Sequence, residues 1–309
     1  MLRSALLTAS RSPGARRFVQ SFPPSRTLAR RFVAGDTVED ALRTAGDLVD
    51  AGLLVTVDHL GEAITDRGQA HRTVASYHKL IDGLAGAGLA ARAEVSVKLS
   101  ALGQSLPDAG ESFALERAFE IVRAADAGGV LVTLDMEDHT TTDGTLRILR
   151  QLRAEVPSVG CALQAALHRT QDDVRALATA GSRVRLTKGA YREPAHRAHQ
   201  RAADIDAAYV SALEILMRSD ARPLVATHDP ALVTTAIRLA QEVRRPPESF
   251  EVQMLYGVRP VEQRRLAANG LDVRVYVAFG VEWYGYVMRR LAERPANLGL
   301  FVRALVPGS

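Results

Sequence analysis

Reactive side chains recur in this sequence directly after short apolar runs that have the length of β-strands. They are Lys98, Asp135 with Glu137 and Asp138, Gln164, Arg185 with Lys188, Thr227 with His228, Gln253, and Tyr276. Inert chain reversals more often carry glycine, proline, asparagine and serine. A set of cations, carboxylates and amides at successive strand ends therefore indicates a candidate active site.

Two of these strand ends could bind phosphate. Lys188, Gly189 and Ala190 follow one apolar run, and Thr227 and His228 follow the next. Exposed backbone amides beside a lysine are suited to a phosphate group. Together the two segments could hold a dinucleotide, although Gly189 by itself would equally suit a tight turn between strand and helix.

The segment from Glu282 to Glu293 reads as a helix with one polar stripe. Arg289 and Arg290 are adjacent, so both can reach one anion, and Glu293 lies where it can orient their guanidinium groups. A carboxylate-bearing substrate is the natural anion for such a pair. The alternative is an exposed amphipathic helix whose arginines are solvated.

A metal site is the competing interpretation of the acids near residue 135. Asp135, Glu137, Asp138 and His139 are residue types that bind Mg, Mn or Zn. The neighbouring strand ends supply cations, which oppose a further positive charge. We therefore predict no metal.

The elements that would position these residues alternate between strand and helix. Eight short runs rich in apolar and β-branched residues occur, at 53–57, 93–99, 130–134, 161–167, 184–187, 224–227, 250–255 and 273–277. Apolar residues at helical spacing lie between them, at 113–125, 146–152, 174–180, 205–217 and 232–243. A further amphipathic helix is expected at 36–50, with Asp36 or Thr37 as its cap.

Near-continuously apolar strands separated by helices predict a parallel sheet covered on both faces. Eight such units predict a (βα)8 barrel of the TIM type, spanning residues 36–309, with its active site at the carboxyl ends of the strands. An open doubly wound sheet is the alternative. It requires a glycine-rich turn after the first strand, and the one candidate, Gly86 to Ala91, follows a helix instead.

Composition limits the class of protein. The chain has 309 residues, 47% of them hydrophobic and 24% charged, which is typical of a globular protein with a sizeable core. The net charge of +4 is spread among interspersed acids and bases, so we predict no nucleic-acid binding. The single cysteine, Cys161, cannot form an intramolecular disulfide, and no run of 18 apolar residues could span a bilayer.

Residues 1–35 differ from the rest of the chain, with seven arginines and no acid. We interpret them as a basic bacterial N-terminal segment, helical or partly disordered, that could touch anionic lipid. The alternative is a mitochondrial transit peptide, which would place the protein in the mitochondrial matrix.

Six segments together resemble the catalytic domain of the proline dehydrogenase family, in the family's order, from about Phe32 to Leu305. They are SVKLS at 96–100, LDME at 134–137, RLTKGAY at 185–191, ATHDP at 226–230, QMLYG at 253–257, and Tyr286 followed by RRLAE at 289–293. The length resembles that of the short monofunctional bacterial form.

The resemblance implies a distorted barrel with N-terminal helices and a noncovalently bound FAD. It also implies oxidation of L-proline to Δ1-pyrroline-5-carboxylate, with hydride transfer to flavin N5 and electrons passed to a membrane quinone. The protein would then lie in the bacterial cytoplasm, peripheral on the inner face of the membrane, and a pyrroline-5-carboxylate dehydrogenase would consume its product.

Site roles follow from the same resemblance. Asp135 and Arg185 would be catalytic-site residues, Asp135 organising Lys98 and Arg185 lying near the reactive edge of the flavin. The proline carboxylate would be bound by Lys98, Arg289 and Arg290, with Glu293 holding the arginines. The walls around the proline ring would be Tyr191, Leu255, Tyr276 and Tyr286. The residues lining the FAD would be Met136, Gln164, Lys188, Gly189, Ala190, Thr227 and His228.

Two other functions compete with this interpretation. A class I aldolase barrel would use Lys188 to form a Schiff base, which requires a lowered lysine pKa. A basic peripheral membrane or nucleic-acid adaptor would need no active site, and it leaves the strand-end residues unexplained.

Overall fold

The structure, a computed structural model, describes residues 29–61 and 64–293, except for the side chains of the last three of these residues. Eight parallel strands pair in sequence order and close into a barrel, because β8 pairs with β1. The strands are β1 (Leu54–His59), β2 (Ala93–Val97), β3 (Leu131–Leu134), β4 (Gly160–Gln164), β5 (Arg183–Thr187), β6 (Arg222–Ala226), β7 (Glu251–Leu255) and β8 (Asp272–Phe279). The predicted eight-stranded barrel is confirmed, and the open sheet is excluded.

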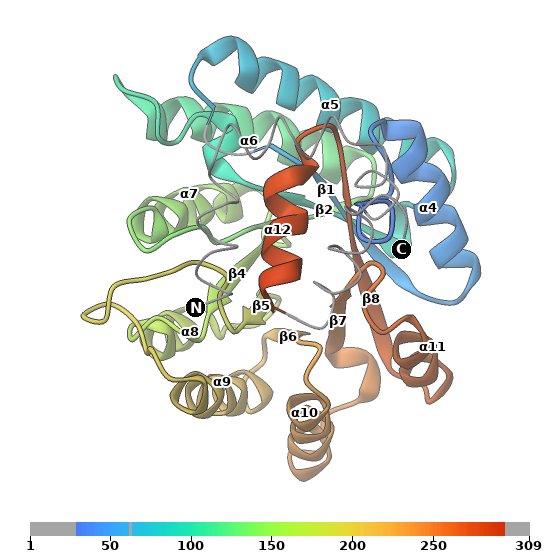
Figure 1. Cartoon of the computed structure of the whole chain (residues 1–309), viewed down its shortest axis with the longest axis vertical. Helices are drawn as coiled ribbons and strands as arrows, with labels where there is room; N and C mark the ends of the chain where they lie inside the picture. Colours follow the sequence, from blue (N-terminus) through green and yellow to red (C-terminus); the bar gives the residue numbers. More distant parts are fainter. Residues whose placement is uncertain (1–28, 62–63, 294–309) are drawn as a thin grey trace, which may run out of the picture.

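Helices surround the barrel in a ring (Figure 1). They are α4 (Val38–Asp50), α5 (Arg67–Gly86), α6 (Gly110–Ala127), α7 (Thr142–Glu155), α8 (Thr170–Leu177), α9 (Ala202–Met217), α10 (Pro230–Glu242) and α11 (Pro260–Ala268). Short 3₁₀ turns lie at Ala90–Arg92, Leu99–Leu102 and Pro247–Ser249. Helix α8 ends three residues before the predicted end. Among the described helices, none is long and apolar enough to cross a bilayer.

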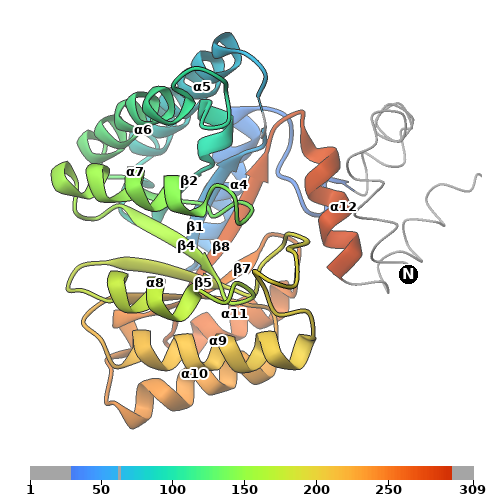
Figure 2. The same cartoon turned by 90° about the vertical axis from the view of Figure 1, so that its left-hand side faces the viewer.

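The helix after the last strand, α12 (Trp283–Glu293), leaves the ring and lies across one end of the barrel (Figures 1 and 2). This is the end at which the strands finish, because α12 follows β8 after a short turn. Helix α4, which precedes β1, packs on the outside of the barrel instead. The barrel is therefore distorted from a regular eightfold repeat, and the displaced helix reaches over the predicted active site.

Helix α4 begins with a reciprocal cap. The backbone N–H of Asp40 donates to the Thr37 hydroxyl at 3.2 Å, and the Asp40 carboxylate accepts from the Thr37 N–H at 3.4 Å. This satisfies two donors that the first helical turn leaves without partners. Thr37, and not Asp36, is the N-cap.

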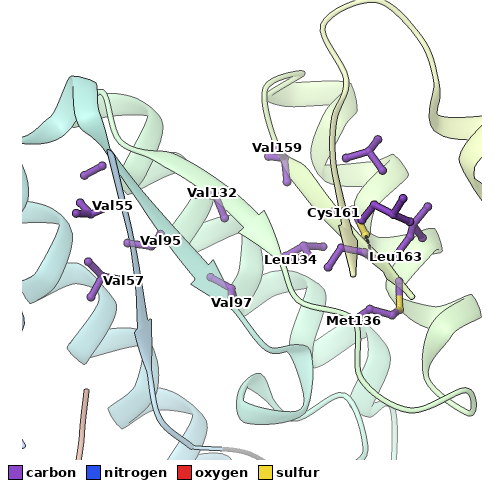
Figure 3. Close-up of a cluster of buried hydrophobic side chains, with 14 of the residues drawn as sticks. Val55, Val57, Val95, Val97, Val132, Leu134, Met136, Val159, Cys161 and Leu163 are labelled. Atoms are coloured by element: carbon purple, nitrogen blue, oxygen red, sulfur yellow. Dashed lines mark hydrogen bonds between the residues drawn. The ribbon is translucent and has the colours of Figure 1, made fainter. Parts of the chain in front are cut away.

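The strands alternate between two kinds of side chain. In β1–β4 the outer face carries apolar residues such as Val55, Val95 and Val132, which pack in the core beneath the helices (Figure 3). The intervening residues point into the barrel, since side chains alternate along a strand. Among them are Thr56, Asp58, Glu94, Ser96, Thr133, Arg183, Arg185, Glu251, Gln253 and Arg274, all buried. The expectation of near-continuously apolar strands is therefore wrong for the inner face.

A second apolar cluster joins the first described residues to α12. Phe32 and Val33 pack with Leu60 and with Trp283, Tyr284, Tyr286, Val287 and Met288 of the helix. Gly257, in the turn after β7, allows the chain at Arg31 to approach. Its φ is +73°, and an added Cβ would lie 1.7 Å from the Arg31 carbonyl oxygen.

We predict that Gly257→Ala destabilises the protein by displacing this segment. Its effect should exceed that of Gly181→Ala by about 2 kcal/mol, because overpacking adds to the cost of a left-handed alanine. Gly181 is the matched control, with φ +75° and no atom within 4 Å of the added Cβ. Denaturant unfolding of the two variants measures the difference, and equal losses would contradict the proposed close approach.

Candidate active site

A cavity of about 730 Å³ lies at the carboxyl ends of the strands, between them and α12. Every site residue predicted from the sequence lines it, with the exception of Glu293, whose side chain lies outside the described residues. The volume falls within the range expected for a ligand-binding pocket. The fold thus brings together residues that are spread over nearly 200 positions of the sequence.

Lys98 is held at the base of the cavity by two carboxylates. Its Nζ donates to the two oxygens of Asp58 at 2.6 and 2.7 Å, and lies 3.3 Å from Asp135 Oδ2. Burial by itself would lower the pKa of Lys98, but the charge of Asp58, the neighbouring Tyr276 and Asp135 outweigh it. The pKa of Lys98 is therefore well above its ordinary value, and the side chain is a fixed cation.

Asp58 is a site residue that our sequence interpretation missed. It lines the cavity from β1 and is completely buried. The predicted first strand ended at Val57, so the acid after it was not counted with the other strand ends. Asp135 does contact Lys98, as expected, but Asp58 is the closer partner.

Asp135 connects three other side chains. It accepts from Arg185 Nη1 at 2.6 Å, from the Ser96 hydroxyl at 2.6 Å and from the Tyr276 hydroxyl at 2.7 Å. Burial would raise the pKa of Asp135, but the charges of Lys98 and Arg185 exceed this effect, so the pKa is lowered. Asp135 is therefore an anion that orients its donors.

Tyr276 is fixed from two sides. Its hydroxyl donates to Asp135, and the Arg185 guanidinium carbon lies 5.4 Å from the centre of its ring. Burial raises the pKa of Tyr276 well above the ordinary value, so the phenol remains a donor. Its contact with the substrate ring stays a prediction.

At the other side of the cavity, Lys188 contacts two acids. Its Nζ lies 2.5 Å from Asp206 Oδ1 and 3.1 Å from Asp229 Oδ2. Burial opposes the charged form, but these hydrogen bonds raise the pKa of Lys188. A lysine with a raised pKa is a poor Schiff-base nucleophile, which is evidence against the aldolase alternative.

Two segments line this side of the cavity, one after β5 and one after β6. The second is fixed by hydrogen bonds between its side chains and the backbone, and the first by the conformation of Gly189. His228 Nε2 accepts from the backbone N–H of Leu255 at 2.9 Å, which assigns the ring proton to Nδ1. The Thr227 hydroxyl accepts from the N–H of Asp229 at 3.1 Å. Gly189 has φ +112°, a conformation that favours glycine, so it serves a tight turn after β5.

The acids near residue 135 have separate partners. Glu137 accepts from the Ser100 hydroxyl at 2.5 Å, Asp138 accepts from Thr140, and His139 contacts Glu193. Within residues 29–61 and 64–293, no group of three acid, histidine or cysteine side chains is arranged to hold a metal ion.

From above, α12 adds Tyr286, Arg289 and Arg290 to the lining of the cavity. The Arg290 guanidinium carbon lies 5.1 Å from the centre of the Tyr286 ring. Cations therefore line the cavity from both the barrel and α12, which suits a small carboxylate between them.

The fold and the cavity define an α/β-barrel protein whose cavity, at the carboxyl ends of the strands, is lined by several cationic side chains. The family described as proline dehydrogenase matches residues 41–303. The chain belongs to the proline dehydrogenase family, and it is an oxidoreductase of proline catabolism.

Individual relatives agree with this assignment. Proline dehydrogenase 1 of Bacillus subtilis is 37% identical over 306 residues, which cover 99% of each chain. Proline dehydrogenase of Deinococcus radiodurans is 35% identical over 310 residues, which cover 100% of this chain and 99% of the relative.

A solved structure is similar in fold. It is proline utilization A (PutA) from Bdellovibrio bacteriovorus inactivated by N-propargylglycine, with a TM-score of 0.81 and 25% identity. The similarity covers 88% of this chain and 33% of that longer chain. The barrel described here thus corresponds to about a third of the PutA protein.

We predict that Asp58→Asn destabilises the protein and weakens substrate binding. Asparagine removes the closest carboxylate partner of Lys98, and breaking a buried pair costs about 3 to 5 kcal/mol. The free energy of unfolding and the KM for proline should both change.

The control is Glu39→Gln, which breaks the pair between Glu39 and Lys79, two side chains that are 70% and 71% exposed. It should leave both quantities nearly unchanged, since solvent screens the charges. If the two variants behaved alike, Asp58 would not hold Lys98.

Proposed function

We propose that this chain uses FAD to oxidise L-proline to Δ1-pyrroline-5-carboxylate. One observation carries the proposal: the cations predicted to bind a carboxylate and the residues predicted to contact a dinucleotide line the same cavity. Membership of the proline dehydrogenase family supplies the substrate class. The proposal is thus narrower than the family assignment, because it specifies a cofactor and residue roles.

The cavity fits a flavin nucleotide. Met136, Gln164, Lys188, Gly189, Ala190, Thr227 and His228 line the part that would hold it. Lys188 and the turn at Gly189 supply a cation and a backbone conformation suited to phosphate groups. A flavin held there would supply the hydride acceptor that oxidation of the substrate requires.

The side chains of this protein would bind and orient the substrate. Lys98, Arg289 and Arg290 would bind the proline carboxylate, and Tyr191, Leu255, Tyr276 and Tyr286 would surround its ring. Fixing a small substrate in one orientation supplies much of the rate enhancement in such a reaction. Asp135, which is ionised, holds Tyr276 and Arg185 in place beside it.

No side chain needs to act as a nucleophile. The substrate amine must be neutral so that its lone pair can assist hydride loss, and the surrounding fixed cations disfavour its protonated form. Arg185 is buried and is hydrogen-bonded on Nε, Nη1 and Nη2, so it supplies a positive charge that needs no reorganisation.

We also propose that a membrane quinone accepts the electrons and that the protein associates reversibly with the inner face of the membrane. The family resemblance and the arginines of the first 35 residues support this part of the proposal. The downstream partner would be an enzyme that oxidises pyrroline-5-carboxylate.

The test is an absorbance spectrum of the purified protein before and after anaerobic L-proline. We expect flavin absorbance that L-proline bleaches and a soluble quinone analogue restores. An acyclic amino acid is the control, because it has the same carboxylate and amine without the ring. Colourless protein after reconstitution with FAD would overturn the proposal.

We predict that Arg289→Met and Arg290→Met each lower kcat/KM for proline while FAD stays bound. Each variant should lose a charge-assisted contact of about 2 to 4 kcal/mol, which corresponds to a decrease of about 30- to 1000-fold.

Arg238→Met is the control, since Arg238 is half exposed on α10 and pairs with Glu242 within the same helix. Steady-state kinetics and the flavin content of each variant decide the outcome. Loss of FAD or unfolding in the Arg289 and Arg290 variants would assign the pair a structural role.

A further inference from the structure

A layer of buried charges fills the barrel next to the cavity. Barrels of this type are usually filled by branched apolar side chains. Here Glu94, Arg183, Glu251 and Arg274 occupy the interior, and each is at most 7% exposed. Arg274 donates to Glu251 at 2.7 and 3.1 Å. Such charges persist in an interior only when they are paired.

The carboxylate of Glu94, on β2, accepts hydrogen bonds from two arginines of β5. Its Oε1 accepts from Arg185 Nη2 at 2.5 Å and from the Thr56 hydroxyl at 2.9 Å, and its Oε2 accepts from Arg183 Nη2 at 2.7 Å. Burial would raise the pKa of Glu94, but Arg185 and Arg183 lower it strongly. One permanent negative charge therefore balances parts of two positive charges.

Arg185 connects this layer to the cavity. Arg185 lines the cavity, whereas Glu94 and Arg183 do not. The remaining contacts of Arg185 are to Gln253 at 2.7 Å, Ser96 at 2.8 Å and Asp135 at 2.6 Å. Gln253 and Ser96 are neutral, so two carboxylates share its charge, one beside the cavity and one beneath it.

We propose that Glu94 is a positioning residue that sets how much positive charge Arg185 presents to the cavity, and thereby tunes the reduction potential of the flavin. The inference rests on the proposed function, since it requires a flavin in the cavity. Reduction adds negative charge to a flavin, so a stronger positive field raises its potential. The effect of one buried charge is large because the interior screens it weakly.

Removing the negative charge of Glu94 and removing the positive charge of Arg183 should shift the flavin potential in opposite directions. Glu94→Gln removes the negative charge, leaves Arg185 less balanced and should raise the midpoint potential. Arg183→Gln removes the competing cation, so Glu94 balances Arg185 more fully and the potential should fall. General loosening of the fold would not produce shifts of opposite sign.

Thr56→Val is a milder variant that conserves shape and every charge. It removes the hydroxyl that donates to Glu94 Oε1, which leaves more of the carboxylate for Arg185. The potential should shift in the same direction as in Arg183→Gln, by a smaller amount. Should Glu94→Gln fail to fold, this variant and Arg183→Gln decide the question.

Glu251→Gln is the matched control. It removes the same charge from the same interior, but Glu251 accepts its hydrogen bonds from Arg274 and Gln253 and not from Arg185, and it lies farther from Arg183, at 3.7 Å, than Glu94 does. Its shift should be smaller than that of Glu94→Gln. Equal shifts would mean that the general field of the interior, and not the contact with Arg185, determines the potential.

The experiment is redox titration of the flavin in wild-type protein and the four variants, with proline kinetics alongside. In Glu94→Gln we expect kcat to fall by up to about 100-fold, because a displaced catalytic group is costly, with a smaller change in KM. Since Glu94 is already ionised, the potential difference from wild type should be constant between neutral and mildly alkaline pH.

The outcomes separate the two proposals. Colourless wild-type protein after reconstitution would overturn the proposed function and this inference together. Yellow wild-type protein that proline reduces would support the function. Potentials that then stay unchanged in the variants, or shift with the same sign in Glu94→Gln and Arg183→Gln, would overturn this inference alone.

Discussion

The guanidinium of Arg185 is the interaction on which the rest of the site depends. It extends from β5 across the barrel to Glu94 of β2, to Gln253 of β7 and to Asp135, which follows β3. Strands β2 and β5 are not neighbours in the sheet, so these side chains meet only through the interior. A closed barrel brings them together, whereas an open sheet of the same strands would separate them.

Each charged side chain in the barrel interior lies next to a side chain of opposite charge. Four acids and four bases lie there: Asp58, Glu94, Asp135 and Glu251 with Lys98, Arg183, Arg185 and Arg274. A buried pair contributes little net stability, because desolvation offsets the attraction, but removal of one partner is strongly destabilising. The paired charges therefore fix the positions of these side chains but add little to the free energy of unfolding. The stabilising apolar core lies on the outer face of the strands.

The displacement of α12 completes the site from the opposite side. If α12 joined the ring of helices, Arg289 and Arg290 would lie outside the barrel and away from Lys98. The cluster formed by Phe32, Val33 and Trp283 holds α12 across the barrel end instead. The close approach permitted by Gly257 thus bears on the position of the arginines, although it is remote from them in sequence.

The sequence by itself determined the order of the elements and most of the lining of the cavity. Alternation of strand and helix is a local pattern, and in a parallel barrel all carboxyl ends of the strands must meet at one end. The pattern alone therefore groups Lys98, Asp135 and Arg185. The start of α4 at Asp36 or Thr37 could be predicted for a similar reason, since a helix cap is a local pattern, and the structure selects Thr37.

Only the tertiary structure decided which side chains are partners. Glu94 and Arg183 are 89 residues apart, and Asp58 and Lys98 are 40 apart, and no local pattern relates them. The pattern of apolar runs does not show that Glu94 and Arg183 point inward, because which face of a strand lines the interior depends on how the barrel closes. The partner of a buried charge is set by register and closure, which are properties of the whole barrel.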